Sequence, residues 1–223
     1  SSSVKAENLN LSIESVPFPL NNMEVNLDYA NNRLMIKKLS SQLESGSVML
    51  AGEVFFDDNE PDMNIKYQLD RATIPILSKS FVNLSGEGII LGNNSPYNFG
   101  GEITVNKGQL VNELSDFTSK SSLGQVRFLP KNQESALGKL INLNLNVKID
   151  NPIRITNSLM DVALKGELSL FGSPMRPRGE GRLFSPLNTS RIFFKNSEYN
   201  ITIADLNFTP KKEISNPDFD IQA

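Results

Sequence analysis

The chain has 223 residues, of which 39% are hydrophobic and 21% charged, and its formal net charge is −3. The absence of His and Cys excludes disulfides, thiolate metal sites, cysteine nucleophiles and Ser-His-Asp triads, and it removes the commonest general base. A pI near 5.2 argues against a nucleic-acid partner, since phosphate binding needs concentrated positive charge. We therefore expect no cofactor, no metal and no nucleic acid.

The two ends of the chain carry no targeting or anchoring pattern. The first residues, SSSVKAENLN, do not resemble a signal sequence, and no apolar run approaches the roughly 18 residues of a membrane-spanning helix. The last residues, NPDFDIQA, stop in the middle of an alternating pattern. We expect residues 1–223 to form a single elongated segment of a longer protein.

Hydrophobic and polar residues alternate through most of the chain, which is typical of strands with one face in water. The stretches 9–13 and 25–29 show the pattern first. The motif V-x-L-x-G-E then occurs three times, at 48–53, 82–87 and 162–167, and each copy runs on to a Pro-bearing turn. Each copy therefore predicts a strand and a turn, and the second and third copies continue into another Gly-rich strand.

The alternation assigns one face of each repeated strand. That face carries Val48, Leu50, Gly52, Val54 and Phe56 in the first copy, Val82, Leu84, Gly86, Gly88 and Ile90 in the second, and Val162, Leu164, Gly166, Leu168 and Leu170 in the third. Glycine within a strand weakens it and often marks a bend. We therefore expect the sheet to bend at Gly52, Gly86 and Gly166.

The segments between and after the repeats follow the same rule with two exceptions. The spacing of Ala136, Leu137, Leu140 and Ile141 predicts a short helix over 134–141, and the stretch at 72–81 is ambiguous because Pro75 interrupts it. Elsewhere the alternation returns: one face collects Leu143, Leu145, Val147 and Ile149, and a later stretch collects Tyr199, Ile201 and Ile203. The predicted fold class is all-β, built of repetitive antiparallel hairpins with at most one or two short helices.

These strands share an apolar face that must be covered or used. A second sheet could cover the face, or a closed barrel could seal it. Tandem hairpins with a common bend would instead form a half-pipe with an apolar concave interior, about 65 Å long for about 14 strands at the usual spacing. In that case the apolar residues assigned above, from Val48 to Ile203, would line the trough, which is wide enough for acyl chains.

The later part of the sequence resembles the C-terminal domain of TamB, of the AsmA-like envelope proteins. The resemblance rests on LNLNVKIDNPIRITNS, VALKGELSLFGSPMRPRGEGRLF, RIFFKNSEYNI, DLNF and NPDFDIQA, in that order, with an earlier and looser copy at 84–110. It covers residues 84–223 well and residues 1–83 only in their alternation. Where the family often has Gly between its last strands, this chain has Ala204 and Asp205, so the turn expected there departs from the family pattern.

The resemblance implies a periplasmic β-taco domain on a protein anchored in the inner membrane and reaching the outer membrane through parts outside this chain. It implies phospholipid acyl chains as ligands, in a trough supporting lipid transport between the membranes. It also leaves an alternative open, a scaffold for outer-membrane protein assembly beside a barrel of the TamA type. A β-rich adhesin is a third reading, favoured if the apolar faces are fully covered.

Other polar clusters have simpler interpretations. Arg176, Arg178, Glu180 and Arg182 alternate onto one strand face and fit a solvated outer surface better than a phosphate site. The cluster Asp57, Asp58, Glu60 and Asp62 lacks calcium-loop spacing and fits an acidic turn. Glu53, Glu87 and Glu167 recur because the strand recurs, and we expect no catalysis from them.

Overall fold

The computed structural model describes residues 2–12, 19–56, 60–77, 79–111, 139–194, 197–214 and 216–222. All of its named elements are strands, which confirms the all-β prediction. The strands are β1 (Ser2–Leu11), β2 (Leu20–Ala30), β3 (Arg33–Gln42), β4 (Ser47–Phe55), β5 (Asp62–Leu77), β6 (Ser80–Gly92), β7 (Tyr97–Val111), β8 (Ile141–Thr156), β9 (Met160–Gly172), β10 (Arg178–Phe184), β11 (Arg191–Phe194), β12 (Ser197–Asn200), β13 (Ile203–Phe208) and β14 (Asp218–Gln222).

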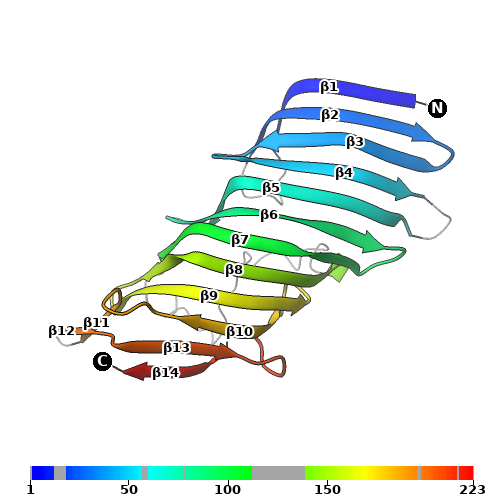
Figure 1. Cartoon of the computed structure of the whole chain (residues 1–223). Helices are drawn as coiled ribbons and strands as arrows, with labels where there is room; N and C mark the ends of the chain where they lie inside the picture. The colour runs from blue at the N-terminus through cyan, green and yellow to red at the C-terminus, as the bar shows by residue number, and fades with distance from the viewer. Residues whose placement is uncertain are drawn as a thin grey trace, which may run out of the picture.

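The strands form one 14-stranded sheet that curls without closing. Strands β1 to β10 follow each other in chain order, and β13 and β14 continue the sheet beyond β10, while β11 pairs with the start of β9 and with β12. Figure 1 shows the strands stacked like rungs from β1 at the top to β14 at the bottom, with the left-hand ends of many strands curving away. The predicted curled half-pipe is confirmed.

One pair of neighbours departs from the predicted run of antiparallel hairpins. Strands β7 and β8 are parallel, and every other pair in the sheet is antiparallel. Parallel neighbours need a connection that returns the chain to the same end of the sheet, here the residues between Val111 and Ile141. The helix predicted over 134–141 falls there: residues 134–138 lie outside the described residues, Lys139 and Leu140 are helical, and Ile141 already begins β8.

Two other local predictions are resolved by the strand boundaries. The ambiguous stretch at 72–81 contains the end of β5 and the start of β6, whose last pair joins Leu77 to Ser80. The turn expected at Ala204 and Asp205 is wrong, because both residues lie inside β13. The interruption between the two strands comes earlier, at residues 201–202, which separate β12 from β13.

Within the described ranges, no helix is long and apolar enough to span a bilayer.

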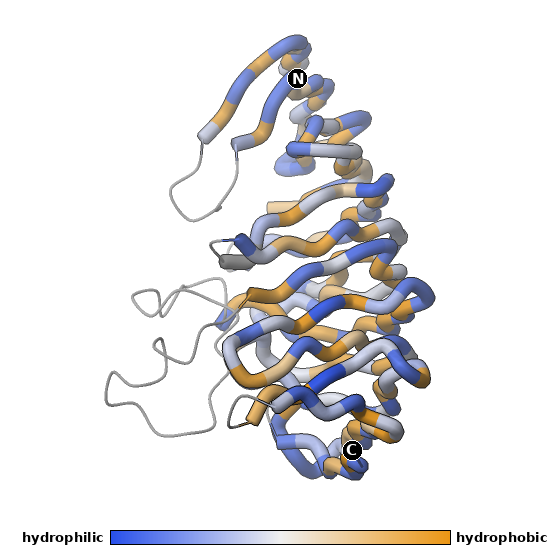
Figure 2. The backbone as a smooth tube through the Cα atoms, turned by 90° about the vertical axis from the view of Figure 1, so that its left-hand side faces the viewer, coloured by the Kyte–Doolittle hydropathy of each residue, from blue (hydrophilic) through white to orange (hydrophobic). Residues whose placement is uncertain are grey.

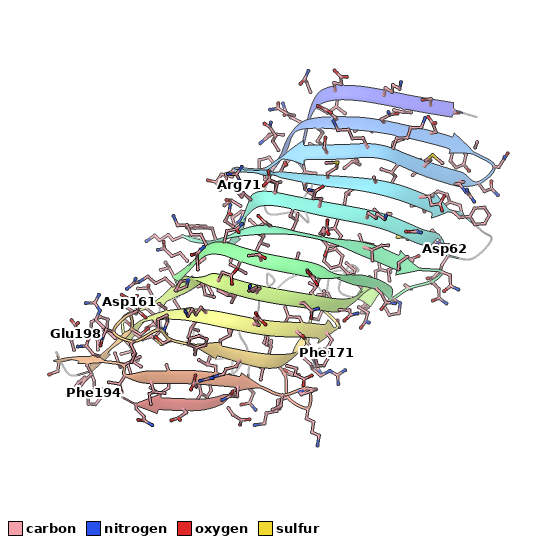
Figure 3. The ribbon with its side chains drawn as sticks, viewed as in Figure 1. Asp62, Arg71, Asp161, Phe171, Phe194 and Glu198 are labelled. Atoms are coloured by element: carbon pink, nitrogen blue, oxygen red, sulfur yellow. The ribbon has the colours of Figure 1, made fainter. Side chains whose placement is uncertain are left out.

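The sheet bends beside the repeat motif because the neighbouring strand carries extra residues there. In each V-x-L-x-G-E copy, one residue separates Leu from Gly. Opposite that one residue the neighbouring strand has two or three: Lys37 and Lys38 in β3, Asp70 and Arg71 in β5, and residues 150–152 in β8. Such β-bulges bend the strand that contains them and increase its twist. Figure 3 places Arg71 at the left of the sheet, where the strands in Figure 1 turn back.

The repeated glycines permit this close approach. Gly52, Gly86 and Gly166 have φ values of +149°, +155° and +140°, a region that side chains of L-residues rarely adopt. A Cβ on Gly166 would lie 2.1 Å from the carbonyl oxygen of Arg182, and the first two glycines face the next strand with almost the same distance. The three glycines are therefore required by the backbone, each at the step where a bulge bends a neighbouring strand.

We predict that Gly166→Ala lowers the free energy of unfolding by at least about 2 kcal/mol, through the strained φ and the collision with Arg182. Gly100→Ala is the matched control, since its φ is not in the strained range and its Cβ would meet nothing closer than 3.3 Å. Urea unfolding followed by circular dichroism measures both. Equal losses in the two variants would contradict a special role for the repeated glycine.

Candidate functional site

The strand register collects the apolar residues of the whole sheet on one face, here called the inner face. One row runs from Leu69 across Gly86, Ile103 and Val147 to Leu168, strand by strand. Other rows contain Leu27, Ile36, Gly52 and Ile65, or Phe99, Leu143 and Gly172. None of the paired positions on this face, in the described strands, carries Asp, Glu, Lys or Arg. Figure 2 shows hydrophobic and hydrophilic residues alternating along the strands.

No second layer of described strands lies on the inner face. The strands in extensive contact are neighbours in the sheet, and β5 and β7 make a slight additional contact across β6. Among the described strands, the apolar face is therefore covered by the curling of its own sheet, and the segments next to β13 add Ile201 and Ile214 at one end. This arrangement leaves a concave apolar surface, the trough, rather than the core of a sandwich.

The predicted lining residues differ in how accessible they are. Half-buried side chains belong to Val48, Leu50, Val82, Leu84, Ile90, Leu143, Leu145, Val147 and Leu170. Buried ones belong to Val54, Ile149, Val162, Leu164, Leu168 and Ile201, and exposed ones to Phe56, Tyr199 and Ile203. Twelve of the eighteen predicted residues are therefore not buried, although Leu84 and Val147 pack against a buried apolar cluster. Leu164 and Leu168 are only 3% and 7% exposed, so they are poorly placed to meet a ligand.

Ile203 lies on the wrong face for the predicted lining. It pairs with Gln222, while the next residue, Ala204, pairs with Ile221 on the inner face. The break at residues 201–202 shifts the alternation between β12 and β13, so Tyr199, Ile201 and Ile203 do not form one continuous strand face. Tyr199 keeps the inner face through its pairing with Ile192, and Ile201 is buried.

The inner face includes residues that the sequence interpretation did not select. Tyr67 of β5 is 4% exposed, and its side chain extends over β6 to β7. There its ring stacks on Phe99, with the ring centroids 4.7 Å apart and the planes within 5°. Its hydroxyl donates a hydrogen bond to the carbonyl of Gly100 at 3.2 Å. A Cβ on Gly88 or Gly101 would lie 2.4 or 2.6 Å from the Tyr67 hydroxyl oxygen. The alternation of Ile65, Tyr67 and Leu69 could have placed Tyr67 on the inner face. Its packing over the neighbouring strand becomes clear only from the register, which pairs Tyr67 with Gly88.

The outer face carries the charged residues, most of them in contact with one another or with aromatic rings. Arg178 lies 5.3 Å from the centre of the Phe171 ring, and Arg182 binds Asp205 through hydrogen bonds of 2.7 and 3.0 Å. This supports the interpretation of the arginine cluster at 176–182 as a solvated outer surface, because its members alternate with inner-face Gly179, Gly181 and Leu183.

The three recurring glutamates lie on β4, β6 and β9, no two of which are neighbours in the sheet. Glu53 pairs with Arg33 at 3.4 Å, and Glu87 and Glu167 lie on the outer faces of separate strands. Of the acidic turn, Glu60 accepts a hydrogen bond from the Ser95 backbone, which lowers its pKa, and Asp57 and Asp58 lie outside the described residues. In the part of the chain that the structure describes, no group of three or more His, Cys, Asp or Glu residues could hold a metal ion.

Asp161 is the most enclosed of the ion-paired acids. Its side chain is 14% exposed and receives hydrogen bonds from Arg154 at 2.6 and 2.8 Å, with Arg191 3.5 Å away. The Arg154 guanidinium therefore holds the pKa of the Asp161 carboxyl below its ordinary value. These contacts tie β8, β9 and β11 together at the left-hand end of the sheet, where Figure 3 labels Asp161.

We predict that Asp161→Asn lowers the free energy of unfolding by about 1–2 kcal/mol at neutral pH. Because the folded pKa is depressed, the stabilisation is present above the unfolded pKa near 4 and is lost as the pH falls through the folded pKa. The difference between variant and parent should therefore shrink in acid. Asp150→Asn, at a side chain 55% exposed, is the control, and a difference that stayed constant down to pH 2 would contradict the assignment.

Comparison with known proteins agrees with this architecture. The family model of the TamB C-terminal domain matches residues 37–223, so the match begins within β3 and extends well before the residues that carried the resemblance most closely. No curated protein and no solved structure gives a significant match. The chain belongs to the TamB C-terminal domain family.

Proposed function

We propose that the trough binds the acyl chains of phospholipids and that the chain serves lipid transport between the inner and outer membranes. The observation that carries the proposal is the inner face, which has no charged residue at its paired positions across fourteen strands. A phospholipid tail needs such a surface, and a folded protein rarely keeps so long an apolar face without a second layer. The proposal requires no catalytic step.

The physical chemistry of burial is adequate for binding and for release. Transfer of each CH₂ from water contributes about 0.8 kcal/mol, so one acyl chain could gain on the order of 10 kcal/mol before costs. Immobilisation of the lipid offsets part of this gain. Half-buried residues such as Leu50, Leu143 and Leu145 offer contact without a closed pocket, which suits a ligand that must move along the surface.

Charge segregation also predicts how a phospholipid would be oriented. Among the described strands, the inner face offers no cation to a phosphate at its paired positions, so a headgroup placed there would lose its hydration without compensation. We therefore infer that the headgroup remains in water at the open side while the tails lie on the inner face. In the envelope this chain would act in the periplasm, as part of a protein anchored in the inner membrane.

Two adjacent residues of β8 allow a direct test. Leu145 points to the inner face and Asn146 to the outer face, so Leu145→Asp and Asn146→Asp add the same charge to opposite sides of one strand. We predict that Leu145→Asp weakens binding of a fluorescent phospholipid at least about tenfold, since an unpaired charge on an apolar surface costs several kcal/mol. Asn146→Asp should bind like the parent.

Circular dichroism would establish that both variants keep their strands. The proposal fails if the folded Leu145→Asp variant binds the phospholipid as well as the parent does. It fails equally if the parent shows no saturable binding.

A second function is favoured by the C-terminal edge of the sheet. β14 pairs with β13 and, within the described residues, with no strand on its other side. Its inner-face residues Phe219 and Ile221 are 63% and 50% exposed. An edge of this kind can accept an added strand from another protein, such as an outer-membrane barrel protein of the TamA type or a nascent outer-membrane strand.

The backbone directions at this edge identify a selective substitution. Ser185 donates its N–H to the carbonyl of Ala204 at 2.8 Å, so the peptide groups of Ala204 face β10. Its partner Ile221 then directs its own peptide groups away from β13, toward the free edge. Ile221→Pro would thus remove an edge donor without removing a bond within the sheet.

We predict that Ile221→Pro abolishes pull-down of a purified TamA-type barrel protein, whereas Ile221→Thr, which keeps the N–H, retains most of it. Phospholipid binding should be unchanged in both variants. Equal capture by all three proteins would argue against pairing at this edge.

A further inference from the structure

The inner face is packed differently on the two sides of the bulge in β8. Before the bulge, Leu143 and Leu145 are half-buried and belong to neither of the two buried apolar clusters. Beyond it, the inner face of β8 and β9 belongs to a buried cluster whose members are Val162, Leu164, Ile201 and Ala204, with Ile153, Ile155, Ile192 and Leu206 packed against them. Exposure there falls to 3% at Leu164 and 2% at Ile201.

The segment between β10 and β13 brings Ile201 into this position. β10 ends at Phe184, and the chain returns to the sheet at Ser190, which is fully buried and accepts the N–H of Ala163 at 2.8 Å. The Ser190 carbonyl then accepts the N–H of Ile201 at 2.9 Å. Ile201 is thus fixed by the backbone, and its side chain packs against Val162 and Leu164.

A second cluster extends the packed region toward the middle of the sheet. It joins Val105, Ile149 and Leu183, and it shares Ile153 and Leu206 with the first cluster. Ile149 and Leu183 lie on either side of Gly166 in the register, where the missing side chain leaves room for both. The inner face of β8 to β13 on the bulge side is therefore filled by the chain itself.

We infer that residues 201–206 form a wall on the bulge side of the trough, so that bound acyl chains reach Leu143 and Leu145 but do not pass beneath Ile201 to Val162 and Leu164. This inference rests on the proposed function for its ligand, while the wall itself rests on the packing alone. It divides the predicted lining residues into a lipid-accessible group and a sealed group.

The absence of cysteine makes a direct test possible with single-cysteine variants. Leu145→Cys probes the accessible group, and Leu164→Cys probes the surface beneath the wall. Each would be treated with N-ethylmaleimide, with and without mixed phosphatidylethanolamine and phosphatidylglycerol vesicles. We predict that Leu164→Cys reacts at least about tenfold more slowly than Leu145→Cys, because modification requires local opening of packed structure. Vesicles should slow the reaction of Leu145→Cys only.

The outcomes separate the wall from the lipid. Rapid modification of Leu164→Cys that vesicles suppress would overturn the wall, since lipid would then reach the sealed group. If Leu164→Cys stays protected and vesicles leave Leu145→Cys unaffected, the wall stands and lipid binding at this site is refuted. Full modification of both variants in urea would show that each cysteine is reactive once exposed. A circular dichroism spectrum like that of the parent would show that each variant is folded. Val162→Cys, a smaller change in the same cluster, replaces Leu164→Cys if that variant does not fold.

Discussion

A sheet whose one face is apolar must remove that face from water, and this chain does so by curling the sheet rather than by adding a second layer. The hydrophobic effect acts on the inner face of every strand, but the described strands offer nothing else to pack against it. Curling brings inner-face side chains of different strands together, as Ile149 and Leu183 meet beside Gly166. The same curl leaves part of the face half-buried, and that remainder is what a lipid could use.

The repeated motif supports the curl through the backbone as well as the side chains. Each V-x-L-x-G-E copy offers a glycine with positive φ beside a neighbouring strand that carries extra residues. The glycine removes the Cβ that would collide with the next strand, and the bulge supplies the bend. Charged residues such as Lys38 and Arg71 fall within the bulges, where they face water, so bending and charge segregation come from the same positions.

Alternation alone was enough to predict the fold class and most of the inner face, because side chains on a strand must point to opposite sides in turn. It correctly separated Leu145 from Asn146, and Gly179 from Arg178. It could not reveal the bulges, since Asp70 and Arg71 look like ordinary polar residues between apolar ones. It also misplaced Ile203. Residues 201–202 interrupt the strand, so the side chains of β12 and β13 do not alternate as one series, although Tyr199, Ile201 and Ile203 are still spaced two residues apart. The parallel pairing of β7 with β8 is not encoded in the alternation, which is the same in parallel and antiparallel strands. The sealing of Leu164 by Ile201 depends on contacts distant in sequence.

The central claim is that the inner face accepts lipid where the chain does not fill it. Native mass spectrometry of the protein purified without detergent from Gram-negative cells tests this most directly. The account predicts a bound population heavier than the apo chain by the mass of phospholipid, released as phospholipid ions when collision energy is raised. A spectrum containing only the apo mass, from protein shown to retain its strands, would contradict it.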